Sequence, residues 1–330
     1  MSLASAADAS MGEAEDGGTA ARVSGHRTCG PAPGLPAPAP LSRDRLTLSP
    51  DWHIIAAREA AMAEIAIGVT GCGGRMGRML IAEIHATSGC RVAGGIDAKG
   101  SAAIGRDLGE LAGLGPLGLA AGDDVAALFA KSDVVVDFTA PDATAAHAAQ
   151  ASRQRKSLVI GTTGLEARHE VAIAEAARTI AIVRAANMSL GVNLLLGLVR
   201  QVAQTLGDDY DIEIAEMHHR HKVDAPSGTA LALGAAAAEG RGIDLAARSA
   251  RGRDGITGPR RKGDIGFASL RGGDVAGEHT VIFAGEAERI ELTHRAGSRQ
   301  IFARGAVRAA QWCVGRKPGL YGMADVLGLR

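Results

Sequence analysis

The stretch "EIAIGVTGCGGRMG", residues 64–77, decides the fold expected for this chain. Its first seven residues form a short β-rich run, and glycines follow at positions 71, 73, 74 and 77. Glycines at a strand end permit a tight turn and let backbone N–H groups approach a pyrophosphate. A helix expected from Arg75 onward directs the positive end of its dipole at the same phosphates. The stretch therefore predicts the strand–turn–helix of a dinucleotide-binding domain.

Strand and helix patterns alternate after this turn, up to about residue 189. Strands are expected at 64–70, 91–97, 132–139, 156–163 and 180–189, and helices at 75–87, 142–154 and 166–178. The run 132–139 is continuously apolar, as in a parallel strand buried on both faces. The alternation predicts an α/β fold with a doubly wound parallel sheet and right-handed crossovers.

The pattern changes after Asn187, which indicates a second domain. An apolar helix is expected at 191–207, and 210–219 alternates with the period of two typical of a strand with one covered face. Further strands are expected at 263–273, 278–285 and 289–296, with connections too short for helices. We therefore expect an α+β domain with a mixed or antiparallel sheet. A helix at 300–315 is expected to return to the first domain.

These patterns place a dinucleotide-binding domain at 62–188, completed by 301–330, and a substrate domain at 189–300. Residues 1–61 differ, because six of the eleven prolines lie there. Two interpretations stay open for this segment: a disordered extension, or a translation start at Met62.

Composition excludes several classes of partner. Lys plus Arg equals Asp plus Glu at 36 each in 330 residues, so nothing favours nucleic acid or an anionic membrane surface. No apolar run reaches the length of a membrane span. The four cysteines form no Cys-x-x-Cys pair, which favours a reducing, cytoplasmic location over a disulfide framework or zinc cage.

Asp97 lies at the end of the second strand, about 20 residues after the glycine turn, where a carboxylate accepts hydrogen bonds from a ribose. A carboxylate repels a 2′-phosphate, so Asp97 favours NADH, whereas Lys99 and Arg75 soften that preference. Use of both NADH and NADPH stays open. Two later strand ends, 161–163 and 185–188, are expected to line the nicotinamide, because ligands lie beyond the carboxyl ends of parallel strands.

The stretch "HHRHKVDAPSGTA", residues 218–230, gathers proton carriers just before a helix start. His218 and His219 end a strand and should point to opposite faces. A metal is disfavoured, because Arg220 and Lys222 would repel a divalent cation. An anion site fits better, since Lys222 and His219, with His218 as a further candidate, give a cationic surface beside the N–H groups of a helix start. A solvated basic loop is the plainer alternative.

Ser227 is the expected N-cap of that helix, which leaves the N–H groups of Gly228 and Thr229 free for the anion. A carboxylate is the expected anion, with Arg299 in "THRAGSR" (293–299) as a further partner. A site for a small acid beside a dinucleotide domain predicts hydride transfer with protonation. Another dehydrogenase of a small acid or semialdehyde, or a cofactor-sensing regulator, remains as an alternative.

Several motifs together resemble the 4-hydroxy-tetrahydrodipicolinate reductase family, also called dihydrodipicolinate reductase. They are "GCGGRMGR" (71–78), "VVDFTAPDAT" (135–144), "VIGTTG" (159–164), "AANMSLGVN" (185–193), "EMHHRHKVDAPSGTA" (216–230), "IGFASLRGGDVAGEHTV" (265–281) and "THRAGSR". The resemblance covers about residues 64–330. It implies a Rossmann-like cofactor domain and a second domain whose sheet makes a homotetramer. It also implies NAD(P)H-dependent reduction of a cyclic imine dicarboxylate with loss of water, in the diaminopimelate route to L-lysine.

The resemblance also implies roles for individual residues. His218 and Lys222 would carry protons, and His219, Gly228 and Thr229 would bind substrate. The residues that would bind cofactor are Gly71, Cys72, Gly73, Gly74, Arg75, Met76, Asp97, Gly161, Thr162, Thr163, Ala185, Ala186, Asn187 and Met188. Ala98 stands where some members carry an arginine for the 2′-phosphate, which argues against a strong NADPH preference. No metal is implied.

Overall fold

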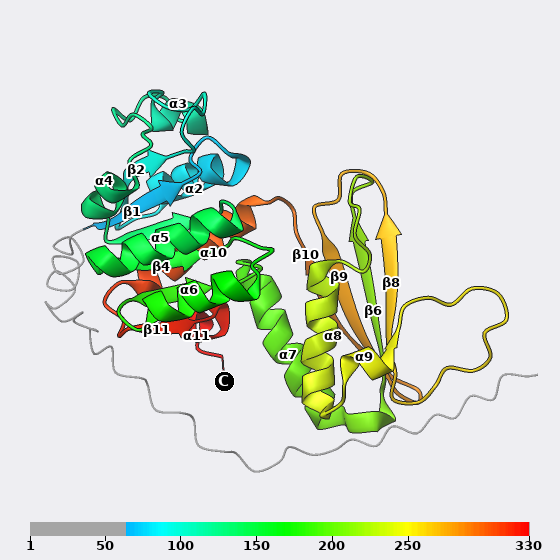
Figure 1. Cartoon of the computed structure of the whole chain (residues 1–330). Helices are drawn as coiled ribbons and strands as arrows, with labels where there is room; N and C mark the ends of the chain where they lie inside the picture. Colours follow the sequence, from blue (N-terminus) through cyan, green and yellow to red (C-terminus); the bar gives the residue numbers. More distant parts are fainter. Residues whose placement is uncertain (1–63, 330) are drawn as a thin grey trace, which may run out of the picture. The chain divides into compact units, whose positions relative to one another are not determined.

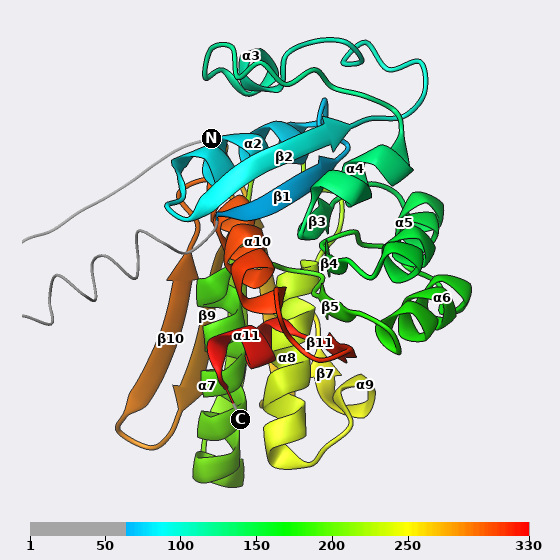
Figure 2. The same cartoon turned by 90° about the vertical axis from the view of Figure 1, so that its left-hand side faces the viewer.

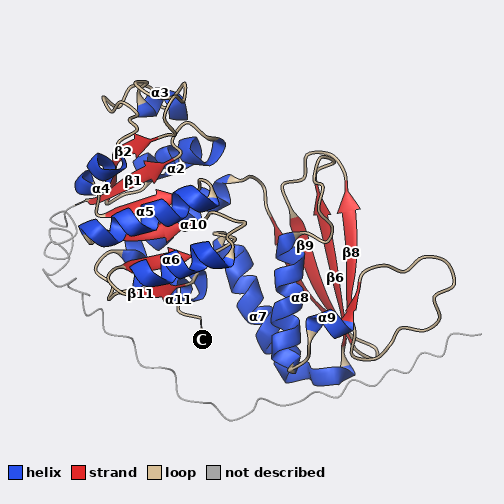
Figure 3. Cartoon of the chain, in the orientation of Figure 1, coloured by secondary structure: helices blue, strands red, loops and turns tan. Residues whose placement is uncertain are grey.

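The computed structural model describes residues 64–329, and the expectation for residues 1–61 lies outside them. All the described residues belong to one compact unit with two β-sheets (Figures 1 and 3). Within residues 64–329, no helix is both long and apolar enough to cross a lipid bilayer.

The first sheet has six parallel strands in the order β11-β5-β4-β3-β1-β2. The strands are β1 (Ile65–Thr70), β2 (Cys90–Ile96), β3 (Val134–Asp137), β4 (Ser157–Ile160), β5 (Ala181–Arg184) and β11 (Gly319–Tyr321). The strand order reverses beside β1, which is the point where open α/β sheets bind ligands. The predicted doubly wound parallel sheet is confirmed.

Helices cover both faces of this sheet. One face carries α2 (Arg75–Ala86) and α10 (Gln300–Cys313), and the other carries α4 (Val125–Lys131), α5 (Pro141–Gln154) and α6 (Ala167–Ala177) (Figures 1 and 2). Successive residues of β3 serve opposite cores: Val134 and Val136 pack with α2 and α10, and Val135 packs with α4 to α6. This alternation explains why the strand is apolar throughout.

The second sheet has the order β10-β9-β6-β8-β7 and is mixed, as predicted. Its strands are β6 (Asp211–His218), β7 (Ser249–Ala250), β8 (Ile265–Arg271), β9 (Glu278–Ala284) and β10 (Arg289–Arg295). β6 runs parallel to β8 and antiparallel to β9. One face packs against α7 (Leu190–Leu206) and α8 (Gly228–Arg241), around a core that includes Val199, Leu233 and Phe283.

Several short elements were not predicted. They are α3 (Leu108–Ala112), α9 (Leu245–Arg248), α11 (Met323–Leu327), the 3₁₀ turn Gly207–Asp209, and also α4, β7 and β11. Each spans seven residues or fewer, too short for a hydrophobic period to show. The strand β11 pairs with β5, so a segment from the end of the chain forms one edge of the first sheet.

Candidate functional site

The turn after β1 needs glycine for steric reasons. Gly71 has φ +65°, in the left-handed region where side chains are rarely accommodated. A Cβ atom at Gly77 would lie 2.1 Å from the carbonyl oxygen of Gly71, and one at Gly73 would lie 2.5 Å from Oδ2 of Asp97. The chain is therefore tightly packed at this point, and no side chains cover the backbone at the glycines of the turn.

The helix that follows the turn begins without a side-chain cap. Its N-cap is Gly74, whereas the N-caps of α7 and α8 are Ser189 and Ser227, whose hydroxyl groups accept a backbone hydrogen bond. The first N–H groups of a helix have no acceptor within the helix, so those of α2 remain available to an anion. A pyrophosphate fits this arrangement, and a reduced nicotinamide dinucleotide bound there would supply hydride.

Asp97 lies directly beside the turn. Its Oδ2 accepts a hydrogen bond from the Gly73 N–H at 2.9 Å, and its Oδ1 accepts one from the Ala98 N–H at 2.7 Å. An ionised carboxylate has about four acceptor positions, so both oxygens can still accept from a ribose. The same carboxylate therefore fixes the turn and can recognise a diol.

The strand end at 161–163 is fixed by threonine side chains. Oγ1 of Thr162 accepts hydrogen bonds from the Thr139 N–H at 3.1 Å and from the Thr144 hydroxyl at 2.8 Å. A Cβ atom at Gly161 would lie 2.2 Å from the ring of Phe138. The ends of β3 and β4 and the start of α5 thus hold one another in place.

Asn187 connects the other strand end to the histidine region. Its Nδ2 donates to Oγ1 of Thr229 at 3.1 Å, and its Oδ1 accepts from the Ser189 N–H at 2.9 Å. The segment 185–188, predicted to bind cofactor, is therefore bonded to the start of α8, predicted to bind substrate.

His218 is the last residue of β6, and His219 is the first residue after the strand. His218 is 8% exposed, and its Nδ1 lies 2.5 Å from Oε2 of Glu216. The backbone N–H of His219 donates to the Val275 carbonyl at 2.8 Å, and its ring lines a cavity. Partial burial, and then the positive charge of Arg299, lower the pKa of His219.

The start of α8 has the predicted geometry. Oγ of Ser227 accepts a hydrogen bond from the Ala230 N–H at 3.1 Å, which confirms Ser227 as the N-cap. Gly228 and Thr229 are the first two residues of the helix, so their N–H groups have no acceptor within it. Lys222 lies on the loop before this helix, and its Nζ donates to Oδ1 of Asp224 at 2.7 Å.

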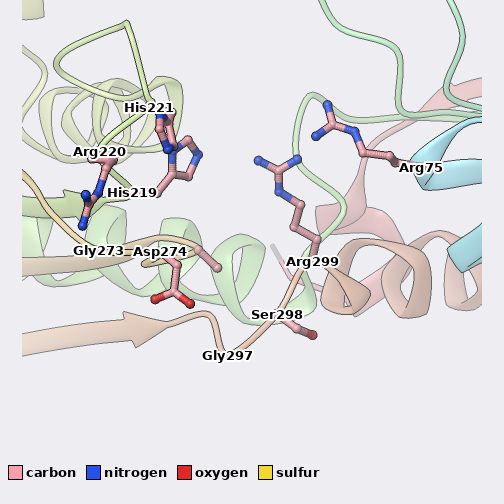
Figure 4. A pocket seen from close by; sticks show the side chains of 10 residues that line it. Arg75, His219, Arg220, His221, Gly273, Asp274, Gly297, Ser298 and Arg299 are labelled. Atoms are coloured by element: carbon pink, nitrogen blue, oxygen red, sulfur yellow. The ribbon is translucent and has the colours of Figure 1, made fainter.

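A cavity of about 870 Å³ unites residues from the two predicted domains. Its lining residues are Arg75, His219, Arg220, His221, Gly273, Asp274, Ala276, Gly297, Ser298 and Arg299. The guanidinium groups of Arg75 and Arg299 lie on one side and the imidazole of His219 on the other (Figure 4). The lining contains three arginines and two histidines but only one carboxylate, so the cavity suits an anion.

The cavity contains three of the predicted site residues: Arg75, His219 and Arg299. As the structure describes it, His218, Lys222, Gly228 and Thr229 lie outside its lining. Sequence reasoning missed Asp274 and gave Arg220 and His221 no role in binding.

Two further polar residues, outside the cavity lining, were also missed. Glu216 and Arg271 form a bidentate pair with both distances at 2.9 Å. A signal for Glu216 exists in the sequence, because the period of two along β6 places it on the same buried face as Ile212, Ile214 and His218.

Residues 65–188 match the family described as dihydrodipicolinate reductase, N-terminus, and residues 191–327 match dihydrodipicolinate reductase, C-terminus. The chain belongs to the dihydrodipicolinate reductase family. This confirms the resemblance inferred from the motifs.

Relatives agree with this membership. The 4-hydroxy-tetrahydrodipicolinate reductase of Parvibaculum lavamentivorans is 61% identical over 268 residues, which are 81% of this chain and 99% of the relative. That of Chelativorans sp. is 59% identical over 268 residues, 81% of this chain and 97% of the relative. Among solved structures, dipicolinate-bound dihydrodipicolinate reductase from Paenisporosarcina sp. TG-14 superposes with a TM-score of 0.65 at 24% identity, covering 79% of this chain and 99% of that one. That likeness shows the fold.

Proposed function

We propose that this reductase-family protein reduces (2S,4S)-4-hydroxy-2,3,4,5-tetrahydrodipicolinate to 2,3,4,5-tetrahydrodipicolinate with NADH or NADPH and loss of water, in the diaminopimelate route to L-lysine. One observation carries the proposal. A single cationic cavity is lined by Arg75, at the start of the uncapped helix α2, and by His219 and Arg299. Cofactor phosphates and a dicarboxylate would therefore bind next to each other.

The proposal divides the chain by task. Residues 62–188, completed by 301–330, hold the cofactor through the turn at 71–76, Asp97 and the strand ends at 161–163 and 185–188. Residues 189–300 hold the substrate. Support comes from the bare helix start of α2 and from the Asn187–Thr229 hydrogen bond, which joins the two groups of residues at 3.1 Å.

The substrate residues act on carboxylates. Arg299 can bind a carboxylate with two parallel N–H bonds, and the N–H groups of Gly228 and Thr229 can bind one at the start of α8. His219 adds a ring N–H. Because the lowered pKa of His219 keeps its ring largely neutral at pH 7, the positive charge of the cavity comes mainly from its arginines.

Protons are supplied by His218 or Lys222 in this proposal. When hydride reaches the ring carbon of the conjugated imine, negative charge moves toward the ring nitrogen, and a proton is needed there. His218 is the last residue of β6, and Lys222 lies with His219 on the loop between β6 and α8.

Assembly and location belong to the proposal too. The face of the second sheet away from α7 and α8 carries Met217 and Leu270, neighbours in the β6–β8 register, and Leu270 is 57% exposed. We expect four copies of the chain to bury this face in a cytoplasmic homotetramer. Light scattering coupled to gel filtration measures the state directly.

The activity is tested by mixing pyruvate, aspartate semialdehyde and the synthase that condenses them with this protein and NADH. That mixture generates the unstable substrate in place. Oxidation of NADH that requires all the components is expected. NADH binding without oxidation would instead favour a cofactor-sensing protein, and oxidation without the synthase would favour another dehydrogenase.

A further inference from the structure

A buried hydrogen-bond network is centred on Glu216, which lies outside the cavity lining. This residue is 2% exposed, although β6 gives it a place among apolar side chains. Arg271 donates to both carboxylate oxygens at 2.9 Å, and the Ser227 N–H donates to Oε1 at 3.2 Å. Nδ1 of His218 lies 2.5 Å from Oε2. One carboxylate therefore contacts groups from β6, β8 and the start of α8.

The partners of Glu216 determine where the proton of His218 resides. A guanidinium and a backbone N–H can only donate hydrogen bonds. Burial alone would raise the pKa of Glu216, but hydrogen bonds from Arg271, Ser269 and His218 lower it to about 2, so the carboxylate is ionised. An ionised carboxylate only accepts, so Nδ1 of His218 must carry a proton. Proton exchange with a ligand is then left to Nε2.

The other groups around His218 do not compete for this role. The ring of His279 meets that of His218 edge-on, with centroids 5.1 Å apart. Burial, and then the electrostatic interaction with His218, lower the pKa of His279 to about 4, so His279 is neutral at pH 7. Near Nε2 the backbone belongs to Gly277, where a Cβ atom would lie 2.9 Å from that nitrogen.

Glu216 also completes the start of α8. In a capping box, the third helical residue reaches back with Glu or Gln to the N–H of the N-cap. The third residue of α8 is Ala230, which cannot do this. Glu216 supplies the missing carboxylate from β6, because its Oε1 accepts from the Ser227 N–H.

We propose that Glu216 is a positioning residue for both parts of the substrate site: it holds His218 with Nδ1 protonated and Nε2 free to exchange a proton, and it anchors the helix start that presents Gly228 and Thr229. The inference rests on the function proposed above. Its distinctive consequence concerns the tautomer of His218, which can be measured without turnover.

The variant Glu216→Gln tests this consequence. An amide has one oxygen and one NH₂, and the position of Oε1 faces two fixed donors, Arg271 and Ser227. The position of Oε2 faces Arg271 and also His218, which alone can change from donor to acceptor. The NH₂ should therefore turn toward His218 and force its proton from Nδ1 to Nε2. The amide oxygen keeps the bond to Ser227.

Long-range ¹⁵N–¹H correlation NMR of the full chain, labelled with ¹⁵N-histidine, distinguishes the two tautomers. The His218 signals are assigned from their loss in His218→Asn. We expect Nδ1–H in the unchanged protein and Nε2–H in Glu216→Gln. In kinetics, kcat should fall by roughly 10²–10⁴-fold, as for loss of a general acid. The substrate KM should change far less, because the helix start is kept.

Two further variants make the result decisive. Glu213 is the matched control, since it lies on the same strand and pairs with Arg253 and Arg260 but contacts neither His218 nor Ser227. Glu213→Gln should leave the tautomer and kcat unchanged. Glu216→Gln/Arg271→Gln removes the arginine charge left unmatched by the single change. The double variant should show the same loss of kcat, and it replaces the single variant in the test if the single variant folds poorly.

The inference is overturned if His218 carries its proton on Nε2 in the unchanged protein, or if both Glu216 variants keep a normal kcat. If the unchanged protein oxidises no NADH with the substrate mixture, the proposed function fails. The tautomer result then still decides whether Glu216 fixes His218.

Discussion

The ammonium nitrogen of Lys222 lies 2.7 Å from the carboxylate of Asp224, on the loop between β6 and α8. The side chain of Lys222 is 20% exposed and that of Asp224 is 54% exposed. The hydrogen bond from Lys222 lowers the pKa of Asp224. A half-solvated pair of this kind contributes little stability, so substrate can draw the lysine away at small cost.

The role of Lys222 is tested by Lys222→Ala. If the ammonium donates the proton, kcat should fall by roughly 10²–10⁴-fold, as is usual for loss of a general acid. The dissociation constant for NADH, measured by fluorescence, should not change. Asp224→Asn removes the partner but keeps the ammonium, so its kcat should stay close to normal. A near-normal kcat in Lys222→Ala would show that the lysine belongs to a solvated loop.

Asp97 should govern the choice between the two cofactors. Its carboxylate repels a 2′-phosphate, and Ala98 offers no cation to offset the repulsion. We expect kcat/KM to be higher with NADH than with NADPH. In Asp97→Ala the ratio of the two kcat/KM values should be closer to one. The variant should also bind NADH more weakly, because the Gly73 N–H loses its acceptor. A strong NADPH preference in the unchanged protein would contradict this account.

The parts of the site that follow local rules could be predicted from the sequence. Gly71, Asp97 and the Ser227 cap each depend on the residues just before and after a strand or helix. The network around Glu216 depends on strand register instead. Arg271 lies opposite His218 only because β8 pairs with β6 in parallel, across 52 intervening positions, and nothing local to either strand fixes that register. The cavity likewise depends on tertiary structure, because Arg75 and Arg299 are far apart in the sequence and line the same cavity.

The glycine turn gives a prediction for cofactor affinity. Gly77→Ala places a Cβ atom 2.1 Å from the Gly71 carbonyl oxygen, so the turn must open. Overpacking of this kind costs about 1–3 kcal/mol. If this cost applies to the conformation of the turn that binds NADH, NADH affinity falls by roughly 5- to 150-fold. Gly122→Ala is the control, because no atom lies within 4 Å of its added Cβ. Equal NADH affinity in both variants would contradict the assignment of the turn.

Arg299 should contribute to substrate binding and not to cofactor binding. A hydrogen bond to a charged group is worth about 1.5–3 kcal/mol, so Arg299→Ala should lower kcat/KM for the substrate by roughly 10- to 150-fold. Arg295→Ala is the matched control, since Arg295 ends β10, outside the cavity lining that the structure describes, and pairs with Glu278. Equal effects of the two variants would remove Arg299 from the site.

His279 should make the protein less stable as the pH falls from neutrality. It is 4% exposed, and burial lowers its pKa to about 4, against an ordinary value of about 6.5. Between those values the unfolded chain binds a proton that the folded chain does not. The free energy of unfolding therefore decreases as the pH falls, by about 3 kcal/mol over the whole range.

Urea unfolding at pH 7, 6 and 5, at one fixed protein concentration, measures this dependence. His279→Gln removes the titrating ring, so its free energy of unfolding should fall less steeply between pH 6.5 and 5, whatever its absolute stability. Ser227→Ala keeps the ring but removes the hydroxyl that lies 3.0 Å from its Nε2. Because burial is the main cause of the lowered pKa, Ser227→Ala should be less stable and yet keep the slope of the unchanged protein. Equal slopes in His279→Gln and the unchanged protein would assign the acid sensitivity to other groups.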